Sequence, residues 1–352
     1  MVIDVSIIIP CRNEERFIGK CLDSIIENNY PKDYLEVLVV DGMSVDETRG
    51  VVEKYTRQYS FIRLLENPKK IIPSAMNIGI KNAKGKIIMK VDSHASYEKN
   101  YISKCIRYLD RYNADNVGGV VIAISRDNKL ISKAIVLSIS NPFGVGNSLF
   151  RIGTKEPVWA DTAFSGCYRK EVFDRIGLYD ENIARSEDVA INSRLRRAGG
   201  RILLVPEIKI YYYARSNFSD FCKHNFDNGF WITYPLTFGR ILFSWRHLIP
   251  LAFVSILIGS FCLWGLSSSS GFLSLLGFWL FAAIILSYSL LNFYFSGKIA
   301  LLHKDFKYFV VMPIVFASLH IGYGIGSLWG LLRVVISQKF WKNLLLKVET
   351  AA

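Results

Sequence analysis

The chain has 352 residues, a formal net charge of +13 and 51% hydrophobic residues. Its length suits about two domains, and its mean hydropathy of +0.24 is high for a protein without membrane segments. The positive charge suits anionic lipid headgroups or phosphate-bearing substrates, and because the sequence has no basic arm and no recognised nucleic-acid-binding motif, we expect no nucleic acid partner.

The hydrophobic residues are concentrated toward one end of the chain. From His247 onward the sequence has long apolar runs and a net charge of +5, whereas residues 1–246 form an ordinary mixed chain with a net charge of +8. The six cysteines show no CxxC pair, which indicates reduced thiols and a cytosolic compartment. The apolar run at 5–9 is too short for a signal peptide. We therefore expect a multi-pass protein of the cell membrane with a cytoplasmic catalytic domain.

The first ninety residues alternate between strands and helices. Helical spacing of apolar residues follows residue 15, acids open a second helix at 46–48, and Pro73 stands near the start of a third. Apolar runs typical of buried parallel strands lie at residues 5–9, 35–40 and 87–91, the last interrupted by one lysine, and a weaker strand lies at 61–65. This rhythm predicts an α/β fold with a parallel sheet and helices on both faces.

Three of these strands end on polar side chains. Asn13 and Glu14 follow the first strand, Asp41 ends the second, and Asp92 follows the fourth. Because ligands of α/β sheets bind at the carboxyl ends of the strands, we expect these groups to line one pocket. A plain turn is the alternative for Asp41 and Gly42. The absence of GxGxxG and GxxxxGK[ST] argues against dinucleotide and P-loop sites of the usual kind.

Asp92 and His94 lie two residues apart at the end of a strand. A carboxylate oxygen with an imidazole nitrogen suits Mn²⁺ or a similar ion, while carboxylate and water alone suit Mg²⁺ better. A cation there could hold a diphosphate. The alternative is an aspartate that caps the next segment beside a surface histidine, and a motif this short does not decide between them.

A second cluster lies between residues 163 and 199. Ser165-Gly166 permits close approach of the backbone to a ligand, or forms a glycine bulge in a strand–turn–helix. Ser186 suits the N-cap of a helix that carries Glu187 and Asp188 in its first turn. That role would explain both acids structurally. The functional alternative is a carboxylate that acts as general base on an acceptor hydroxyl.

Taken together, these motifs resemble glycosyltransferase family 2, and most closely its membrane-anchored branch of succinoglycan-type exopolysaccharide glucosyltransferases, in which the metal motif is Asp-x-His. The resemblance covers roughly residues 3–215 and implies a GT-A (Rossmann-like) fold, a nucleotide-diphospho-sugar donor and inversion of the anomeric centre. The motifs that carry it are residues 5–10, Asn13-Glu14-Glu15, Asp41, Asp92-Ser93-His94, Gly166 with Tyr168-Arg169, Glu187-Asp188 with Leu195 and Ala198-Gly199, and the tail at 319–326.

The resemblance assigns the nucleotide-sugar site to the first half of the chain. It implies that Pro10, Asn13 and Glu14 shape the nucleotide end, that Asp41 holds the uracil or ribose, and that Gly166 belongs to the same site. A UDP-sugar is the favoured donor.

The resemblance also assigns the reacting groups. Asp92 and His94 would hold Mg²⁺ or Mn²⁺ at the diphosphate, with Asp92 also counted among the donor-binding residues. Asp188 would be the catalytic base, with Glu187 beside it. A single displacement needs one base and no enzyme nucleophile, so the absence of an obvious Ser-His or Cys-His pair is expected.

Two departures from the family pattern affect the prediction. The metal motif ends in His94 where the broader family has aspartate. The Gln-x-x-Arg-Trp motif of processive synthases is absent, since the corresponding region at 223–231 reads KHNFDNGFW. We therefore predict addition of a single sugar rather than polymerisation.

The last hundred residues contain two clear membrane spans at 248–266 and 272–295 and a third hydrophobic segment at 309–332. The segment before the first span and the loop after the second both carry basic residues, so the positive-inside rule predicts that both face the cytosol. Simple alternation would put the basic tail at 337–352 outside, whereas its lysines favour the inside, so the topology of the third segment stays open. Its glycine-rich centre would permit a broken or re-entrant segment.

The remaining boundaries follow from these spans. We expect a glycosyltransferase domain at 1–217, an aromatic, amphipathic interfacial linker at 218–246 and a transmembrane region at 247–336. Core packing is the alternative role for the linker. For His320, packing against small residues is favoured over contact with a lipid phosphate.

The function expected from the sequence is an inverting, non-processive transfer of a hexose. The acceptor would be a polyprenyl-diphosphate-linked saccharide at the cytosolic membrane face, with membrane lipid as a partner. One alternative keeps the chemistry but uses polyprenyl phosphate itself as acceptor. Another is a catalytically silent membrane scaffold, which would have no need for Asp92 and Asp188. A transporter is disfavoured, because the spans contain no acid or base besides His320.

Overall fold

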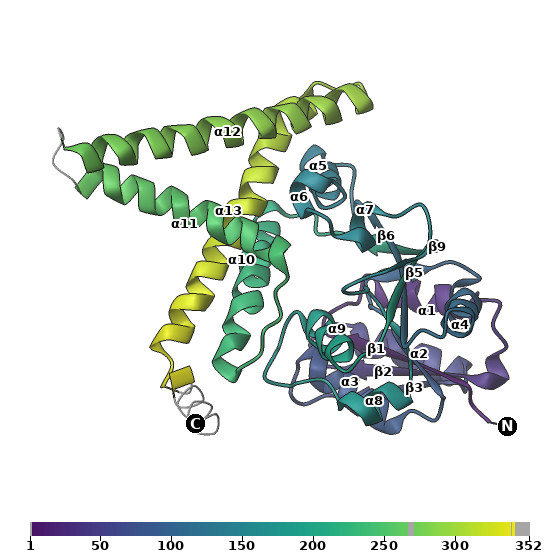
Figure 1. Cartoon of the computed structure of the whole chain (residues 1–352). Helices are drawn as coiled ribbons and strands as arrows, with labels where there is room; N and C mark the ends of the chain where they lie inside the picture. Colours follow the sequence, from purple (N-terminus) through teal and green to yellow (C-terminus); the bar gives the residue numbers. More distant parts are fainter. Residues whose placement is uncertain (1, 267–270, 339, 342–352) are drawn as a thin grey trace. The chain divides into compact units, whose positions relative to one another are not determined.

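The computed structural model of the chain describes residues 2–266, 271–338, 340 and 341. It consists of two compact units (Figure 1). The first comprises the chain up to Ile124 together with Ser148–Tyr213, and the second comprises Ser125–Asn147 and the chain from Ala214 onward. The expected serine turn at 267–270 and most of the basic tail lie outside the described residues.

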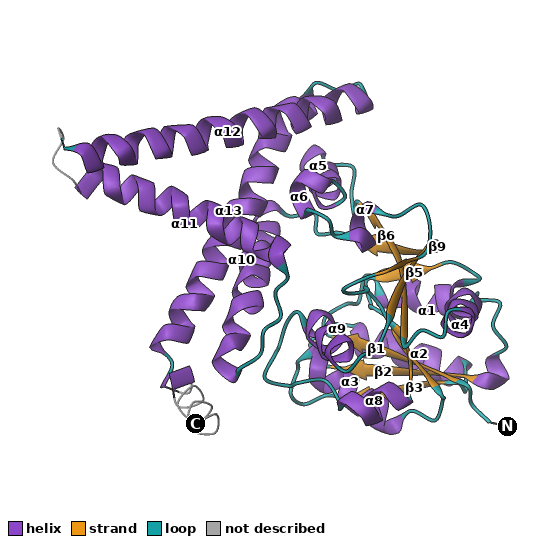
Figure 2. Ribbon diagram, in the orientation of Figure 1, coloured by secondary structure: helices purple, strands orange, loops and turns teal. Residues whose placement is uncertain are grey.

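The first unit is built on one mixed sheet (Figure 2). Its strands are β1 (Val5–Cys11), β2 (Leu35–Asp41), β3 (Ile62–Glu66), β4 (Ile87–Lys90), β5 (Ala95–Tyr97), β6 (Asn116–Ile124), β7 (Val158–Trp159), β8 (Cys167–Arg169) and β9 (Ile202–Tyr213). Their order is β3-β2-β1-β4-β8-β6-β9-β5, with β7 paired to β9. Strands β1 to β4 are parallel, as predicted. Strand β8 runs antiparallel to both of its neighbours, β4 and β6, so the second half of the sheet is not purely parallel.

Helices cover both faces of this sheet, as predicted. They are α1 (Ile18–Ile26), η1 (Lys32–Tyr34), α2 (Thr48–Gln58), α3 (Ile72–Asn82), α4 (Tyr101–Arg111), α7 (Leu149–Ile152), α8 (Glu171–Ile176) and α9 (Glu187–Arg197). Successive strand residues point to opposite faces. Ile7 and Ile9 of β1 therefore pack in one core with α1, α2 and α4, while Ile8 packs in the other with α3, α8 and α9.

The parallel strands bring the predicted ligand groups to one edge of the sheet. Cys11 is in register with Asp41 across β1 and β2, and Ile8 is in register with Lys90 across β1 and β4. Asp41 and Asp92 therefore lie at the carboxyl ends of the two strands that flank β1, whose backbones are about 10 Å apart.

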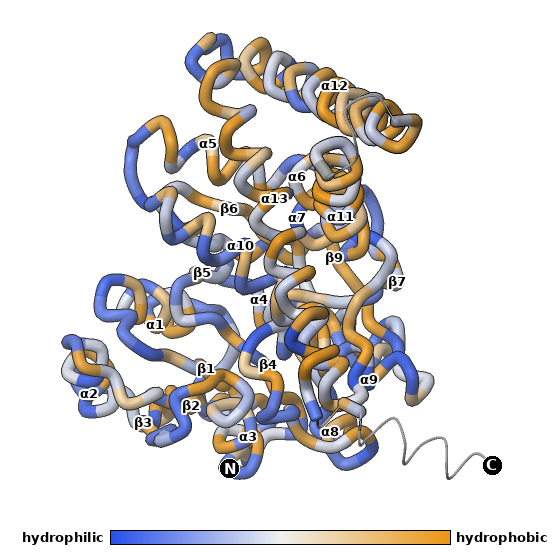
Figure 3. Tube along the Cα trace, turned by 90° about the vertical axis from the view of Figure 1, so that its left-hand side faces the viewer, coloured by the Kyte–Doolittle hydropathy of each residue, from blue (hydrophilic) through white to orange (hydrophobic). Residues whose placement is uncertain are grey.

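The second unit is helical. Its elements are α5 (Leu130–Ile139), α6 (Pro142–Val145), α10 (Phe218–Thr233), η2 (Tyr234–Phe238), α11 (Trp245–Leu266), α12 (Phe272–His303) and α13 (Lys307–Ile336). The last three are predominantly apolar (Figure 3), and within the described chain Trp245–Gly265, Phe272–His303 and Lys307–Ile336 are long and apolar enough to cross a membrane. These helices coincide with the three hydrophobic segments expected from the sequence.

A short insertion from the first half of the sequence belongs to the helical unit. Ala134 and Ile135 of α5 are buried in one apolar cluster with Ile299 of α12 and with Met312 and Phe316 of α13. The sequence boundaries assigned residues 125–147 to the glycosyltransferase domain. In the structure α5 instead buries its apolar face against helices that lie more than a hundred residues later.

Helix α10 packs against α13 along a row of glycines. Gly322, Gly326 and Gly330 recur every four residues and therefore share one face of α13. A Cβ atom built on Gly326 would lie 2.0 Å from the carbonyl oxygen of Phe226, and one on Gly330 would lie 2.2 Å from the hydroxyl of Thr233. Small residues thus allow the two backbones to touch. Helix packing is the observed role of this part of the linker, and its placement at a membrane surface stays a prediction.

The glycine-rich centre of α13 does not interrupt the helix, so the broken or re-entrant alternative is wrong for the described residues. His320 lies in this centre. Its Nε2 is 2.8 Å from the carbonyl oxygen of Phe143, and its Nδ1 is 3.0 Å from the hydroxyl of Tyr288. The imidazole thus joins α6, α12 and α13, which supports the packing role over contact with a lipid phosphate.

We expect Gly326→Ala to lower the thermal stability of the purified full-length protein, because the added methyl group would force α10 away from α13. Gly259→Ala on α11 is the matched control, since a Cβ at Gly259 has no neighbour within 4 Å and alanine favours helix by about 1 kcal/mol. Thermal unfolding followed by a thiol-reactive dye measures both variants. Equal midpoints for the two variants would contradict the close packing.

Candidate active site

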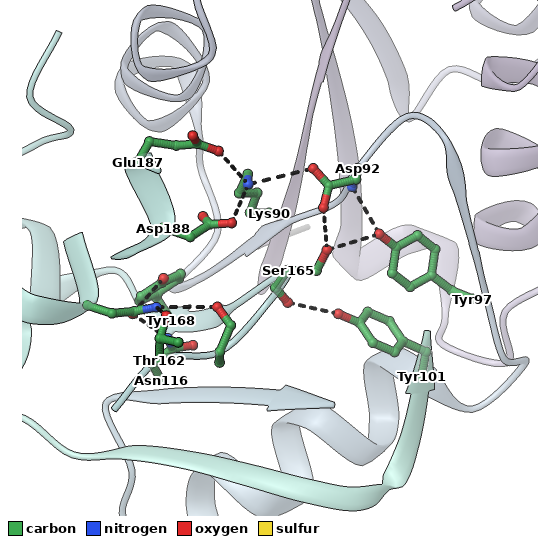
Figure 4. Close-up of polar contacts among 12 residues, drawn as sticks. Lys90, Asp92, Tyr97, Tyr101, Asn116, Thr162, Ser165, Tyr168, Glu187 and Asp188 are labelled. Carbon is green, nitrogen blue, oxygen red and sulfur yellow. Dashed lines mark hydrogen bonds and ion pairs between the residues drawn. The ribbon is translucent and has the colours of Figure 1, made fainter. Parts of the chain in front are cut away.

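The centre of the site is Lys90, the last residue of β4 (Figure 4). Its side chain is only 2% exposed, and its Nζ is 2.7 Å from Asp188 Oδ2, 3.0 Å from Glu187 Oε1 and 3.6 Å from Asp92 Oδ1. Burial alone would lower the pKa of Lys90, but the three carboxylates outweigh it and hold that pKa well above its usual value. Lys90 is therefore a permanent cation that brings together acids about a hundred residues apart.

Asp188 differs from its neighbours in having one oxygen available. Its Oδ2 is bonded to Lys90, whereas its Oδ1 is buried and has no hydrogen-bond partner among the described residues. Burial raises the pKa of Asp188 to about 7, an effect that Lys90 opposes and that Glu187 and Asp92 reinforce. A carboxylate with a pKa near the working pH and a free oxygen is suited to accept a proton.

Helix α9, which begins with Glu187 and Asp188, is held in place by a buried polar residue later in the same helix. Asn192, fully buried one and a half turns later, accepts hydrogen bonds from Asn116 Nδ2 at 2.9 Å and from the Tyr168 hydroxyl at 3.0 Å. It also donates to Thr162 Oγ1 at 2.9 Å. These bonds fix α9 to β6, β8 and the segment before β8.

The start of α9 differs from the sequence expectation. Ser186 does stand at the N-cap position, but it has a left-handed backbone with φ 62° and makes no side-chain capping bond. Glu187 and Asp188 therefore follow a sharp turn of the chain, and their ion pairs with Lys90 account for them better than a first-turn role alone.

Asp92 is held on its other side by a second polar group. Ser165 Oγ donates to Asp92 Oδ2 at 2.9 Å and lies 3.3 Å from the Tyr97 hydroxyl, which also accepts the backbone N–H of Asp92 at 2.9 Å (Figure 4). Burial disfavours the ionised form of Asp92, but Lys90 outweighs it, so the pKa of Asp92 is lowered. Both carboxylate oxygens thus have neighbours and the group is ionised.

The loop after β1 reaches the same edge. Asn13 has a left-handed φ of 55° and accepts the backbone N–H of Val45 at 3.0 Å. Glu14 Oε1 lies 3.3 Å from Nδ1 of His94, a contact without hydrogen-bond geometry, so that this buried nitrogen has no partner among the described residues. His94 packs its ring against Tyr212. Glu14 and His94 are thus in contact at this edge, while the side chain of Asn13 is bonded to the loop after β2.

Asp41 is at this edge but is completely buried. Its oxygens accept from the backbone N–H and hydroxyl of Ser44 and lie 3.5 Å from Arg49 Nη1. In the structure it organises the loop after β2, as the turn alternative proposed, and no oxygen faces solvent. Its contact with a base or ribose stays a prediction.

Pro10 and Gly166 have local structural roles. Pro10 lies in β1 in register with Val40. A Cβ built on Gly166 would lie 2.5 Å from the ring of Tyr168 and 2.6 Å from Asn116 Oδ1. Packing therefore already requires glycine at 166, without any ligand.

The residues at this edge fit a divalent cation in part. Asp92 and His94 offer an ionised carboxylate and a buried, unpartnered imidazole nitrogen, which is a donor set suited to Mn²⁺. Within the described part of the chain no group of three His, Cys, Asp or Glu side chains is placed to hold a metal. Protein ligands alone would not complete the coordination, so substrate phosphates and water would supply the rest.

Lys90 is the functional residue that the sequence analysis missed. The sequence contained an indication, because a single lysine, two residues before Asp92, interrupts an otherwise apolar strand. A buried lysine needs acidic partners, and in this chain they lie 97 and 98 positions away. Asn192 was missed as well, since a buried asparagine in a helix leaves no periodic pattern.

Comparisons with known proteins identify the family and the fold of this chain. The profile of Glycosyl transferase family 2 matches residues 6–177. A mannosyltransferase from Pyrobaculum calidifontis, solved in complex with GDP-Man and Mn²⁺, matches the fold with a TM-score of 0.55 at 16% identity, covering 92% of this chain and 87% of its own. The first unit is thus a GT-A-like domain.

Two curated relatives match most of the chain. The dolichyl N-acetyl-alpha-D-glucosaminyl phosphate 3-beta-D-2,3-diacetamido-2,3-dideoxy-beta-D-glucuronosyltransferase of Methanococcus voltae is 30% identical over 263 residues, which are 72% of this chain and 80% of that protein. The succinoglycan biosynthesis protein ExoA of Rhizobium meliloti is 27% identical over 257 residues, 72% of this chain and 76% of that protein. The chain therefore belongs to glycosyltransferase family 2 and is a glycosyltransferase.

Proposed function

We propose that this enzyme transfers a single hexose from a nucleotide-diphospho-sugar, most favourably a UDP-sugar, to a polyprenyl-diphosphate-linked saccharide, with inversion at the anomeric carbon. The observation that carries the proposal is the position of Asp188. It is a buried carboxylate with a pKa near 7 and an unpartnered Oδ1, and it shares Lys90 with the donor-side acid Asp92.

One displacement accounts for this arrangement. Asp188 Oδ1 accepts the proton of an acceptor hydroxyl as its oxygen forms a bond to the anomeric carbon. The bond from that carbon to the diphosphate breaks on the opposite face, and the electron pair leaves with the nucleoside diphosphate. Lys90 holds Asp188 in position throughout, and no covalent enzyme intermediate is needed.

Mg²⁺ or Mn²⁺ is the proposed cofactor. Asp92 and His94 would hold it, and when bound it would neutralise charge on the leaving diphosphate. The lowered pKa of Asp92, which keeps this carboxylate ionised, and the Nδ1 of His94, which has no hydrogen-bond partner among the described residues, support this assignment.

We expect Asp92→Asn to lower the Mn²⁺-dependent affinity for UDP by at least about 10-fold, since the ionised ligand is lost. Calorimetric titration of UDP with and without Mn²⁺ measures the effect. Asp33→Asn, which changes an exposed acid of the same domain, is the control. An unchanged Mn²⁺-dependent affinity in Asp92→Asn would remove Asp92 from the proposed metal site.

A cytosolic, multi-pass arrangement is part of the proposal. Arg240 precedes α11 and Arg246 is the second residue of that helix, while Lys298, Lys304 and Lys307 surround the connection from α12 to α13. The positive-inside rule therefore places both connections in the cytosol. A lipid-linked acceptor would reach the enzyme from the membrane.

Single-sugar transfer is proposed because the Gln-x-x-Arg-Trp pattern of processive synthases is missing from residues 223–231. The lipid-linked acceptor is supported by the Methanococcus voltae relative, whose name specifies a dolichyl-phosphate-linked sugar as acceptor.

The proposal is tested on the purified full-length protein. Thermal shifts with UDP-, GDP- and dTDP-sugars, with and without Mn²⁺, identify the donor. That donor is then offered with polyprenyl-diphosphate saccharide or with plain polyprenyl phosphate, and the product is examined by NMR for its anomeric configuration. One added sugar with inverted configuration on the saccharide is expected. If product formed only on polyprenyl phosphate, that lipid would be the acceptor instead of the proposed saccharide. A complete lack of donor binding would favour a scaffold.

A further inference from the structure

A partly buried arginine near the site, Arg151, has no counter-ion among the residues that the structure describes. Arg151 lies in the short helix α7, which packs on β6 (Figure 1). Its Nη1 atom is buried and has no hydrogen-bond partner among the described residues, and no described acid lies within ion-pair distance of its guanidinium. A guanidinium keeps its charge in a protein, so an uncompensated one in a buried position is costly.

Aromatic rings link Arg151 to the candidate active site. The guanidinium lies 5.3 Å from the ring centroid of Phe150, which stacks on Phe164 at 6.1 Å. Phe164 meets Tyr212 edge to face at 5.7 Å, and Tyr212 meets His94 at 5.1 Å. This continuous row of rings, Phe150, Phe164, Tyr212 and His94, runs from Arg151 to the predicted metal ligand.

The row is tied directly to the acids. Phe164 precedes Ser165, whose hydroxyl bonds to Asp92. Burial lowers the pKa of the Arg151 guanidinium, and the only opposing influence comes from Tyr212. The charged form therefore lacks the compensation that a bound anion would give.

We propose that Arg151 binds a phosphate oxyanion of a substrate. A guanidinium matches phosphate geometry with two parallel N–H bonds, and Nη1 of Arg151, which has no hydrogen-bond partner among the described residues, is the donor that such a phosphate would satisfy. The proposal rests on the proposed function, which supplies two possible sources of this anion, namely the diphosphate of the donor and the phosphate next to the lipid of the acceptor.

Binding measurements separate these sources without requiring turnover. Full-length Arg151→Gln is compared with the wild type for UDP affinity in Mn²⁺ by calorimetry, and for retention on phosphatidylcholine vesicles with and without undecaprenyl phosphate. Arg57→Gln, which removes an arginine whose side chain is 81% exposed in the same domain, is the control. Where transfer is measurable, the Michaelis constant should rise for one substrate with little change in kcat.

We expect Arg151→Gln to lose about 10- to 100-fold in affinity for one of the two probes. A loss for UDP identifies the donor diphosphate, and a loss for undecaprenyl phosphate identifies the acceptor. Equal affinities for both probes in a folded Arg151→Gln protein overturn the proposal.

Arg151→Lys covers the case in which Arg151→Gln fails to fold. It keeps the charge but not the planar fork, so a smaller loss for the same probe is expected, and unchanged affinities would reduce Arg151 to a structural role. A wild-type protein that binds UDP and undecaprenyl phosphate, with variants that bind both probes equally well, contradicts this inference alone. A wild-type protein that binds neither probe contradicts the proposed function and, with it, this inference.

Discussion

Asp188→Asn is expected to lower the transfer rate by about 10²- to 10⁴-fold, the usual contribution of a positioned general base. Asparagine has nearly the same size and shape as aspartate but cannot take a proton from the acceptor hydroxyl. The loss should appear in kcat, while the affinity for UDP in Mn²⁺ stays close to that of the wild type, because Asp188 lies on the acceptor side of Lys90 in the proposed mechanism.

The pH dependence of the wild type tests the same role. Burial raises the pKa of Asp188 to about 7, and a base acts only when it is deprotonated. The rate should therefore fall as the pH is lowered through about 7 and level off above it. In Asp188→Asn the residual activity should lack this dependence.

The control for this variant is Asp174→Asn, which makes the same change on an exposed position of α8. It should retain wild-type activity and the wild-type pH profile. Turnover by Asp188→Asn equal to that of the control would remove Asp188 as the base, and a large loss of UDP affinity would show that the variant has disturbed the donor site instead.

The half of the fold that could be predicted from the sequence is the half whose strands and helices each carry a local hydrophobic pattern. Strands β1 to β4 and the helices between them each carry a continuous apolar run or helical spacing, and their order in the sheet follows from parallel connections. The antiparallel strand β8 has three residues, Cys167–Arg169, and is inserted between β4 and β6. Its position depends on pairing with distant segments, which no local pattern encodes.

The helical unit shows the same limit. The three long apolar helices were predictable from hydrophobicity alone, because a membrane span is a local property of the sequence. The position of α5 among them was not, since its burial depends on α12 and α13. The continuity of α13 through its glycines also depends on a partner, because α10 packs on that face.

The candidate site was predictable where strand ends supply it. Glu14 and His94 are in contact because the parallel strands that they follow share one edge. The pairing of Glu187 and Asp188 with Lys90 was not foreseen, since it joins side chains that are 97 and 98 positions apart in the chain. Arg151 was not foreseen either, because the proposal for it depends on the lack of an acidic partner among the described residues, which only the folded structure reveals.

Lys90→Met is expected to destabilise the enzyme strongly. Methionine fills much of the same volume but leaves three buried carboxylates without their cation, and removing one partner of a buried ion pair costs about 3–5 kcal/mol. For a domain of this size such a loss lowers the unfolding midpoint by on the order of 10 °C. Thermal unfolding of the full-length protein measures it, with the exposed Lys99→Met as the matched control.

The pH dependence of the stability of Lys90→Met tells charge compensation apart from simple loss of packing. In this variant the pKa of Asp188 should rise further above its value in the unfolded chain, because the ammonium group that lowers it is gone. A carboxylate whose folded pKa is raised favours folding at low pH and loses that contribution as the pH rises. The deficit should therefore be larger at pH 8 than at pH 5.

Adding Glu187→Gln and Asp188→Asn to Lys90→Met should then restore much of the lost stability, because two of the three uncompensated charges are removed, although activity stays absent without the base. Non-additivity of this kind is the expected result for residues in one ion-pair network. If the triple variant were less stable than Lys90→Met by the sum of the separate effects, or if Lys90→Met matched Lys99→Met, the ammonium group would not be what holds Asp92, Glu187 and Asp188 together.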